Sequence, residues 1–196
     1  MKEIAQHFLR HVITHKDFFS DKAIKDMGIL FPPFREKVEA GISKFNEKYP
    51  DVKVIPVETY RSNERQMMHY NNGASKIKKD GMHHFAIAID LAGEVKGKFT
   101  YDIDYKHLRR CIEETGLTLL GVWDMGHSQY IPVGDQGALR KACYGAVEDF
   151  QRQYGLKVDG EPGSKTATKA KEVFANEIAQ AQAVGGKNSN KGKAKP

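Results

Sequence analysis

The sequence predicts an α+β fold, in which a small antiparallel sheet with flanking helices carries a metal site and a C-terminal helical hairpin follows. Three observations lead to this prediction. Strand-like and helix-like segments are mixed, without the strict alternation that a parallel sheet requires. Residue types that bind metals gather in two short segments, 83–90 and 123–127. Beyond Pro132 the strand patterns end and helical patterns take over.

Helical periodicity accounts for four segments before that point. Apolar residues recur on one side of residues 3–15, which predicts the first helix. Pro32-Pro33 interrupts the chain before a second helix near 34–48. Two further helices are expected over residues 63–71 and 105–115.

The predicted strands are short and lie between these helices. Residues 52–59 form a β-branched run, and residues 84–92 carry the first group of metal-ligand residue types. Two more strands, over 117–122 and 128–133, flank the second group.

Side-chain alternation along residues 84–92 suggests where a metal could lie. Ala86, Ala88 and Asp90 share one face, and the small alanines leave space beside the carboxylate. The opposite face carries side chains that we expect in the core: Ile87, Ile89 and Leu91. His83 lies seven residues before Asp90, an odd number, so it must belong to a loop or bulge that enters the strand.

His83, Asp90 and His127 form a complete set of zinc ligands. Catalytic zinc typically takes three protein ligands from His and Asp or Glu and keeps a fourth position for water. Asp124 lies three residues before the last ligand and would act as the base for that water. The sequence therefore predicts a zinc hydrolase with Zn²⁺ as its cofactor.

Three motifs, in order along the chain, resemble those of the zinc D,D-carboxypeptidase and L-alanyl-D-glutamate endopeptidase family, which cuts peptidoglycan stem peptides. Residues 83–90 are similar to the family pattern His-x-x-Gly-x-Ala-x-Asp, and residues 124–127 to Asp/Glu-x-x-His. Residues 59–66 resemble the family stretch Tyr-Arg-Ser-x-x-x-Gln. Three motifs in order are far more specific than any one of them.

The resemblance implies roles for residues beside the ligands. Arg61 would face the reacting carbonyl and stabilise the oxyanion, because a guanidinium stays charged and donates in a fork. Tyr60, Ser62 and Gln66 would bind the substrate. The base of this family is Asp in many phage-type endopeptidases, so Asp124 favours an endopeptidase.

Three positions depart from the family pattern. Gly81 replaces the Ser that usually lies two residues before the first ligand. Ala86 replaces the motif glycine, a change that is tolerable where the backbone φ is negative. Gly126 replaces the Pro before the last ligand, and we expect it to loosen that loop. The departures bear on substrate preference more than on the metal site.

The chain changes character after the last predicted strand. Helices are expected over 139–154 and 166–183, joined by a turn-rich connector. Roughly residues 145–175 resemble the latter half of a peptidoglycan-binding helical module. A hairpin packed on the catalytic domain is an equal alternative. The predicted division is a catalytic domain over 1–134, a helical peptidoglycan-binding-like segment over 135–183 and a disordered basic tail over 184–196.

Charge and composition exclude several classes of protein. The 196-residue chain has a formal charge of +6, of which the tail carries four, which leaves +2 elsewhere, without a basic helix or aromatic–basic platform for nucleic acid. No apolar run approaches the roughly 20 residues of a membrane span. Cys111 and Cys143 are expected to be buried thiols rather than a disulfide. The tail charges belong to Lys187, Lys191, Lys193 and Lys195.

The N-terminal residues lack the apolar stretch and cleavage site of a signal peptide. We therefore expect synthesis in the cytoplasm and action on the cell wall after release, as for a phage-type endolysin. A bacterial protein that uses another exit is the alternative. The expected partner is peptidoglycan, and the expected state is a monomer.

Three functions remain open at this stage. The leading one is an L-alanyl-D-glutamate endopeptidase, and the second is a D-alanyl-D-alanine carboxypeptidase with the same zinc chemistry. The third is a non-catalytic wall-binding protein that keeps the fold. The intact base Asp124 and the arginine Arg61 argue against the third.

Overall fold

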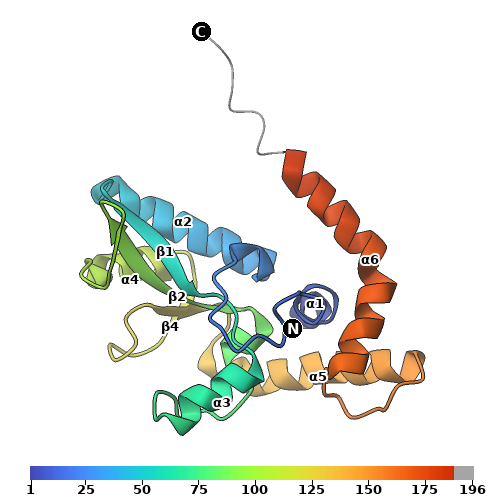
Figure 1. Cartoon of the computed structure of the whole chain (residues 1–196). Helices are drawn as coiled ribbons and strands as arrows, with labels where there is room; N and C mark the ends of the chain where they lie inside the picture. The colour runs from blue at the N-terminus through green and yellow to red at the C-terminus, as the bar shows by residue number, and fades with distance from the viewer. Residues whose placement is uncertain (188–196) are drawn as a thin grey trace.

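The structure, a computed structural model, describes the backbone of residues 1–187 and the side chains of residues 1–175. One antiparallel sheet lies at its centre, with strand order β1-β2-β5-β4 and with β3 paired to β2. Helices flank this sheet, which confirms the expected α+β class (Figure 1). The strands are β1 (Val52–Glu58), β2 (Ala88–Val95), β3 (Lys98–Thr100), β4 (Thr118–Leu119) and β5 (His127–Gln129).

Helices α2 (Pro32–Lys48) and α4 (Tyr105–Glu113) pack against each other and contact the sheet at β1 and β4. Their close approach depends on Gly41. A Cβ at this position would lie 2.6 Å from Cδ1 of Ile112, closer than real carbon atoms approach. The bare glycine therefore lets the two helices meet, and the apolar faces that they share are buried.

The first helix is less regular than its periodicity predicts. It begins as α1 (Lys2–His7) and continues as a π-helical turn, η1 (Phe8–Val12), in which the amide of Ile13 donates to the carbonyl of Phe8 at 2.9 Å. The wider turn keeps Phe8, Val12 and Ile13 fully buried. The predicted segment 3–15 is thus helical in its first part and ends in turns.

The metal-bearing strand begins later than we expected. Residues Met82–Phe85 form a 3-10 turn, η3, and Ala86 follows in the left-handed region at φ 54°. The alanine therefore occupies a conformation that favours glycine, so the condition under which this replacement is tolerable, a negative φ, is not met. Strand β2 starts only at Ala88, so the alternation holds for Ala88 and Asp90 but does not include Ala86.

Three strands beside the site also differ in length from those that the sequence predicts. Strand β2 extends to Val95 and turns into β3 through Lys96 and Gly97, both at positive φ. Such a two-residue turn matches the twist of an antiparallel hairpin. Strands β4 and β5 are shorter than predicted, and a seven-residue loop, 120–126, runs between them. Helix α3 (Asn63–Asn71) has the predicted bounds.

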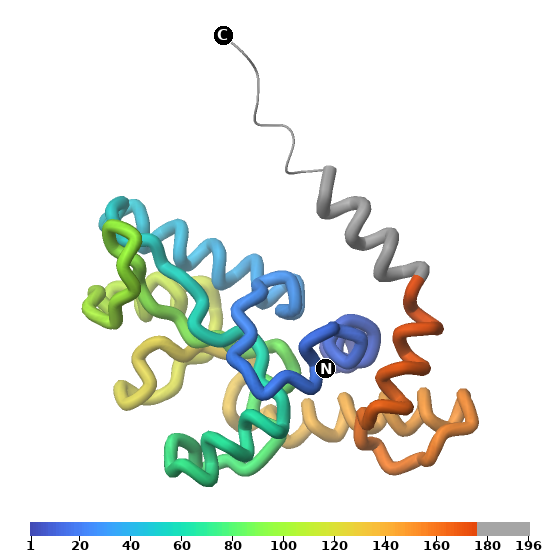
Figure 2. Tube along the Cα trace, in the orientation of Figure 1, coloured from blue at the N-terminus to red at the C-terminus, as the bar shows by residue number. Residues whose placement is uncertain are grey.

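The C-terminal helices pack on the rest of the chain. They are α5 (Gln136–Gln153) and α6 (Ser164–Lys187), and α5 packs against α1 (Figures 1 and 2). Buried side chains of both helices belong to the same apolar core as those of α1, β2 and η3. No break in packing separates residues 1–134 from 135–175 within the described side chains. The core residues from this segment are Leu139, Cys143, Val147, Phe150, Ala167, Ala170 and Phe174.

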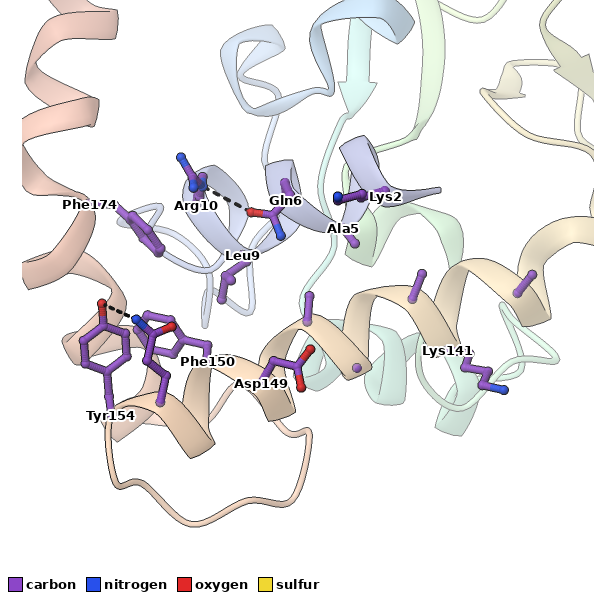
Figure 3. Close-up of a pocket in the computed structure, with 15 residues that line it drawn as sticks. Lys2, Ala5, Gln6, Leu9, Arg10, Lys141, Asp149, Phe150, Tyr154 and Phe174 are labelled. Carbon is purple, nitrogen blue, oxygen red and sulfur yellow. Dashed lines mark hydrogen bonds between the residues drawn. The ribbon is translucent and has the colours of Figure 1, made fainter.

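An open groove of about 790 Å³ lies between α1, α5 and α6. Leu9, Phe150 and Phe174 line its apolar part, and Gln153 donates to the hydroxyl of Tyr154 at one end (Figure 3). None of the metal-ligand residues contributes to this groove.

Three further expectations concern the thiols, the C-terminal tail and membrane-spanning segments. Cys111 and Cys143 are buried and free, as expected. Residues 184–187 of the predicted tail belong to α6, and residues 188–196 lie outside the part of the chain that the structure describes. Within the described residues, no helix is long and apolar enough to cross a bilayer.

A chain that ends at Gly134 should be strongly destabilised, because it loses the helix that covers α1. Each large apolar side chain that becomes buried contributes about 1.5–3 kcal/mol. The free energy lost with the burial of Leu139, Val147 and Phe150 is therefore comparable with the ~5–15 kcal/mol that stabilises a whole domain. We expect the truncated chain to aggregate or to melt far below the full chain in a thermal scan. A truncated chain that melts cooperatively within a few degrees of the full chain would show that residues 1–134 fold alone.

Candidate metal centre

Two carboxylate side chains and one imidazole form a row across the sheet. Asp90 of β2 pairs with Glu58 of β1 on one side and with His127 of β5 on the other. Directly opposed residues in antiparallel strands point to the same face, with Cβ atoms about 4.5–5.5 Å apart. The sheet register therefore brings together Asp90 and His127, which are 37 positions apart in the sequence.

His83 approaches this row from η3, as its odd spacing from Asp90 predicted. Its Nε2 lies 3.3 Å from Oδ1 of Asp90, and Nδ1 of His127 lies 3.0 Å from the same oxygen. One ligand atom from each of the three residues falls within 4.8 Å of the others. The structure thus brings together the whole predicted ligand set.

The donor set and its spacing fit zinc. Two imidazoles and one carboxylate are a common protein ligand set for this ion. Ligand atoms of a tetrahedral zinc, each about 2.0–2.1 Å from the ion, lie about 3.3 Å apart. The two distances to Asp90 Oδ1, 3.3 and 3.0 Å, are close to this value. The three ligand atoms all lie within 4.8 Å of one another, so these side chains could hold one ion.

Electrostatics keep the ligand carboxylate charged. Burial alone would raise the pKa of Asp90, but the charges and hydrogen bonds of His83 and His127 outweigh it and hold the pKa well below its ordinary value. Asp90 is therefore ionised at neutral pH, which is the form that binds a metal ion.

Asp124 lies at the edge of this cluster, on the loop between β4 and β5. Its Oδ2 is 4.0 Å from Nδ1 of His127, and about a third of its side chain, 35%, is exposed. Burial raises the pKa of Asp124, and the negative charge of Asp90 adds to this, while His127, His83 and Arg61 oppose it. A carboxylate with a raised pKa and access to solvent is suited to accept and return a proton.

The loop that carries Asp124 is fixed from α4. The guanidinium of Arg109 donates to the carbonyls of Leu120 and Asp124, the latter at 3.1 Å. Val122 and Trp123, immediately before Asp124, are 80% and 77% exposed. The loop is thus held by its backbone while it presents apolar side chains to solvent beside the cluster.

Gly126 tightens this loop, contrary to our expectation that it would loosen it. Its carbonyl accepts from the amide of Leu91 at 3.0 Å, and a Cβ at this position would lie 2.5 Å from the carbonyl oxygen of Leu91. The loop can approach β2 this closely only because residue 126 has no side chain. The contact places His127 opposite Asp90.

Gly126→Ala should therefore displace the ligand that follows it. The added methyl must push the loop off β2, so we expect a lower melting temperature and weaker zinc binding than in the unaltered chain. Gly134→Ala is the matched control, because nothing lies within 4 Å of a Cβ at that position. Equal zinc affinity in Gly126→Ala and Gly134→Ala would show that the close contact does not position His127.

Arg61 lies beside the cluster of His83, Asp90 and His127, as the motif implies. Its guanidinium donates to Oε2 of Glu58, with Nε at 2.7 Å, to Oδ2 of Asp90 at 3.4 Å and to Oε1 of Gln66 at 3.2 Å. Glu58 also accepts from Arg65. A buried carboxylate thus anchors the cation next to the ligands.

All three predicted substrate-binding residues are buried inside the fold. The side chain of Tyr60 is fully buried and its hydroxyl donates to the carbonyl of Phe18 at 2.7 Å. Ser62 is also buried and caps α3. In this conformation neither side chain offers a surface to a substrate, so both support the Arg61 segment instead. Gln66 is buried as well, but it contacts Arg61 directly.

Glu58 is a site residue that the sequence analysis missed. It ends a strand that otherwise reads as ordinary core, and no motif marks it. Burial would raise the pKa of Glu58, but hydrogen bonds and charge from Arg61, with help from His83 and Arg65, lower it below the ordinary value. The sequence did offer one signal, because the segment 58–65 begins with an acidic residue, Glu58, and ends with a basic one, Arg65.

Glu58→Gln should destabilise the fold in a pH-dependent way. A carboxylate with a depressed pKa stabilises the folded state above its unfolded pKa, about 4.3, and this contribution is lost as pH falls through the folded value. At pH 7 we expect a loss of about 2–3 kcal/mol, since two arginines lose their buried partner. Between pH 5 and 3 the melting temperature of the variant should fall less than that of the unaltered chain.

Glu94→Gln is the control for this measurement, because the carboxylate of Glu94 pairs with the exposed Lys53 from the same sheet, at 3.4 Å. Its melting curve should follow the unaltered chain over the same pH range. If the melting curve of Glu58→Gln also follows that of the unaltered chain, the buried carboxylate does not anchor the arginines.

His84, next to the first ligand, points away from the cluster. Its ring packs against the rings of Phe8, Phe18 and Tyr60, with centroids 5.6, 5.7 and 6.0 Å away. Burial lowers the pKa of His84 to about 4, so this ring is neutral at pH 7. It is therefore part of the core rather than a ligand.

Comparison with known proteins finds a matching family model and a similar solved structure. Residues 127–169 match the family model described as a putative peptidoglycan binding domain, which confirms the expected likeness of the C-terminal segment. The chain is also similar to the crystal structure of the Serratia marcescens L-Ala D-Glu endopeptidase ChiX, at 18% sequence identity and a TM-score of 0.43. That alignment covers 58% of this chain and 92% of the other. No curated protein sequence matches the chain.

Proposed function

We propose that this chain is a zinc peptidase that cleaves stem peptides of peptidoglycan, at the L-alanyl-D-glutamate bond. The observation that carries the proposal is the cluster of His83, Asp90 and His127, with a carboxylate and a guanidinium on its flanks. The match of residues 127–169 to a putative peptidoglycan binding domain supports the polymer as substrate.

The roles of the residues follow from their chemistry. A zinc ion held by the three ligands would lower the pKa of its water to about 7 and polarise the peptide carbonyl. Asp124 would accept the proton of that water and return it to the leaving amine, which its raised pKa favours. Arg61 would donate to the oxygen on which negative charge develops. Glu58 would hold the guanidinium in place for that contact.

Asp124 also supports the endopeptidase over the D-alanyl-D-alanine carboxypeptidase, because the motif that it completes has Asp in many phage-type endopeptidases. Such an enzyme would act on the wall as an endolysin does. The carboxypeptidase remains the second candidate, with the same metal ligands and the same base.

Digestion of purified peptidoglycan tests the proposal. Mass spectrometry of the products should show new amino-terminal glutamate and disaccharide units that end in L-alanine. Release of free D-alanine instead would assign the carboxypeptidase. Intact stem peptides after incubation with a zinc-loaded chain would exclude both activities and leave a wall-binding protein.

A further inference from the structure

The turn before the first ligand is held in an unusual conformation. Asp80, three residues before His83, is buried and has a φ of 61°, in the left-handed region that residues other than glycine rarely adopt. Its amide donates to Oδ1 of Asn63 at 2.9 Å, and its Oδ1 accepts from Nδ2 of Asn63 at 3.0 Å. The first residue of α3 therefore holds one side of this turn.

Helix α5 holds the other side. The hydroxyl of Tyr144 donates to Oδ1 of Asp80, and Nε of Arg140 donates to the carbonyl of Asp80 at 3.0 Å. Burial, with the hydrogen bond to Asp80, raises the pKa of the Tyr144 hydroxyl, so it remains a donor. Both contacts join residues at least 60 positions apart, from the C-terminal segment to the ligand loop.

Tyr144 is itself packed against the connector between α5 and α6. Gly160 of that connector has a φ of 71°, and a Cβ there would lie 3.6 Å from Cβ of Tyr144. The connector is ordered by Gln151, whose Oε1 accepts from the amides of Asp159 and Gly160 at 3.0 and 2.9 Å. A continuous set of contacts thus runs from the connector through Tyr144 and Asp80 to the ligand loop.

We infer that Tyr144 and Arg140 are positioning residues for the metal site, which they hold through Asp80 and the turn before His83. The C-terminal segment is therefore part of the catalytic unit and not a detachable wall anchor. The inference rests on the proposed metal site. It assigns to α5 a role that the match to a putative peptidoglycan binding domain does not describe.

Titration of the full-length chain with cobalt(II), followed by visible absorption, tests this inference, because cobalt accepts the same nitrogen and oxygen ligands as zinc. Tyr144→Phe should weaken cobalt binding about tenfold, in the range typical of groups that orient metal ligands. Arg140→Gln should weaken it similarly. Tyr154→Phe is the matched control on the same part of the chain, since its hydroxyl accepts a hydrogen bond from Gln153, at 3.4 Å, and has no hydrogen bond to the ligand loop. The control should bind cobalt as tightly as the unaltered chain.

A double-variant cycle identifies the route of the effect. Asp80→Gly keeps the backbone conformation accessible but removes the carboxylate, so adding Tyr144→Phe to it should cause no further loss of affinity. The melting temperature of each metal-free variant separates a general loss of stability from a misplaced ligand loop.

Three results would overturn the inference. The first is unchanged cobalt affinity in Tyr144→Phe and Arg140→Gln, and the second is equal weakening in Tyr154→Phe. The third is full additivity of Asp80→Gly with Tyr144→Phe. An unaltered chain that binds no cobalt would refute the metal site itself, and the inference with it. That failure is distinct, because it appears before any residue is replaced.

Discussion

His127→Ala is expected to strip the metal from the protein. The imidazole is one of three ligands whose atoms lie within 4.8 Å of one another, so its loss leaves a two-ligand site that cannot retain zinc against dialysis. Groups that only orient ligands cost about 10–100-fold in metal affinity, and a ligand should cost more. Elemental analysis after dialysis should find about one zinc per unaltered chain and almost none in the variant.

His84→Leu is the matched control, because His84 neighbours the ligand His83 but packs among aromatic rings of the core. This variant should keep its zinc. The ligand assignment is wrong if His127→Ala retains a full complement of zinc, or if His84→Leu loses as much as His127→Ala.

Asp124→Ala is expected to retain zinc but lose peptidase activity by a factor on the order of 10² or more, as for the removal of a positioned base. Asp124 is not among the three residues that we propose as ligands, which could hold the ion without it. Asp124→Asn keeps the volume of the side chain and should be equally inactive, which separates proton transfer from packing. Arg61→Ala should show a loss of similar size, because it removes the donor to the oxyanion.

Cleavage rates on a soluble stem peptide measure this loss, with the zinc content determined on the same samples. If zinc-loaded Asp124→Asn cleaves at the rate of the unaltered chain, another group is the base. If only Arg61→Ala remains active, the guanidinium serves the structure through Glu58 rather than the reaction.

The sequence was sufficient to predict that His83, Asp90 and His127 lie together, and one geometric rule bears on how they do so. The odd separation of His83 from Asp90 excluded a single strand, and the structure places His83 on η3 as that argument requires. The backbone conformation of the neighbouring residues was harder to predict. Alternation alone extended the strand back to residue 84, although Ala86 adopts a left-handed conformation that no composition rule predicts for alanine.

Other features depend on contacts between distant parts of the chain, which local patterns do not contain. Glu58 became a site residue only through the pairing of β1 with β2, and Gly126 proved tight only because it lies against Leu91. The packing of α5 on α1 likewise cannot be derived from periodicity, which predicts that a helix has an apolar face but not what covers it. The hairpin at Lys96-Gly97, by contrast, was visible in the sequence and was missed.

Cleavage of a purified muropeptide by the metal-free and the zinc-reconstituted protein tests the central claim most directly. The unaltered chain should cut the stem peptide, lose this activity on removal of zinc by a chelator, and regain it when one equivalent of zinc is restored. Mass spectrometry should locate the cut between L-alanine and D-glutamate. Cleavage that persists in the metal-free protein, or no cleavage after full reconstitution with zinc, would contradict the account.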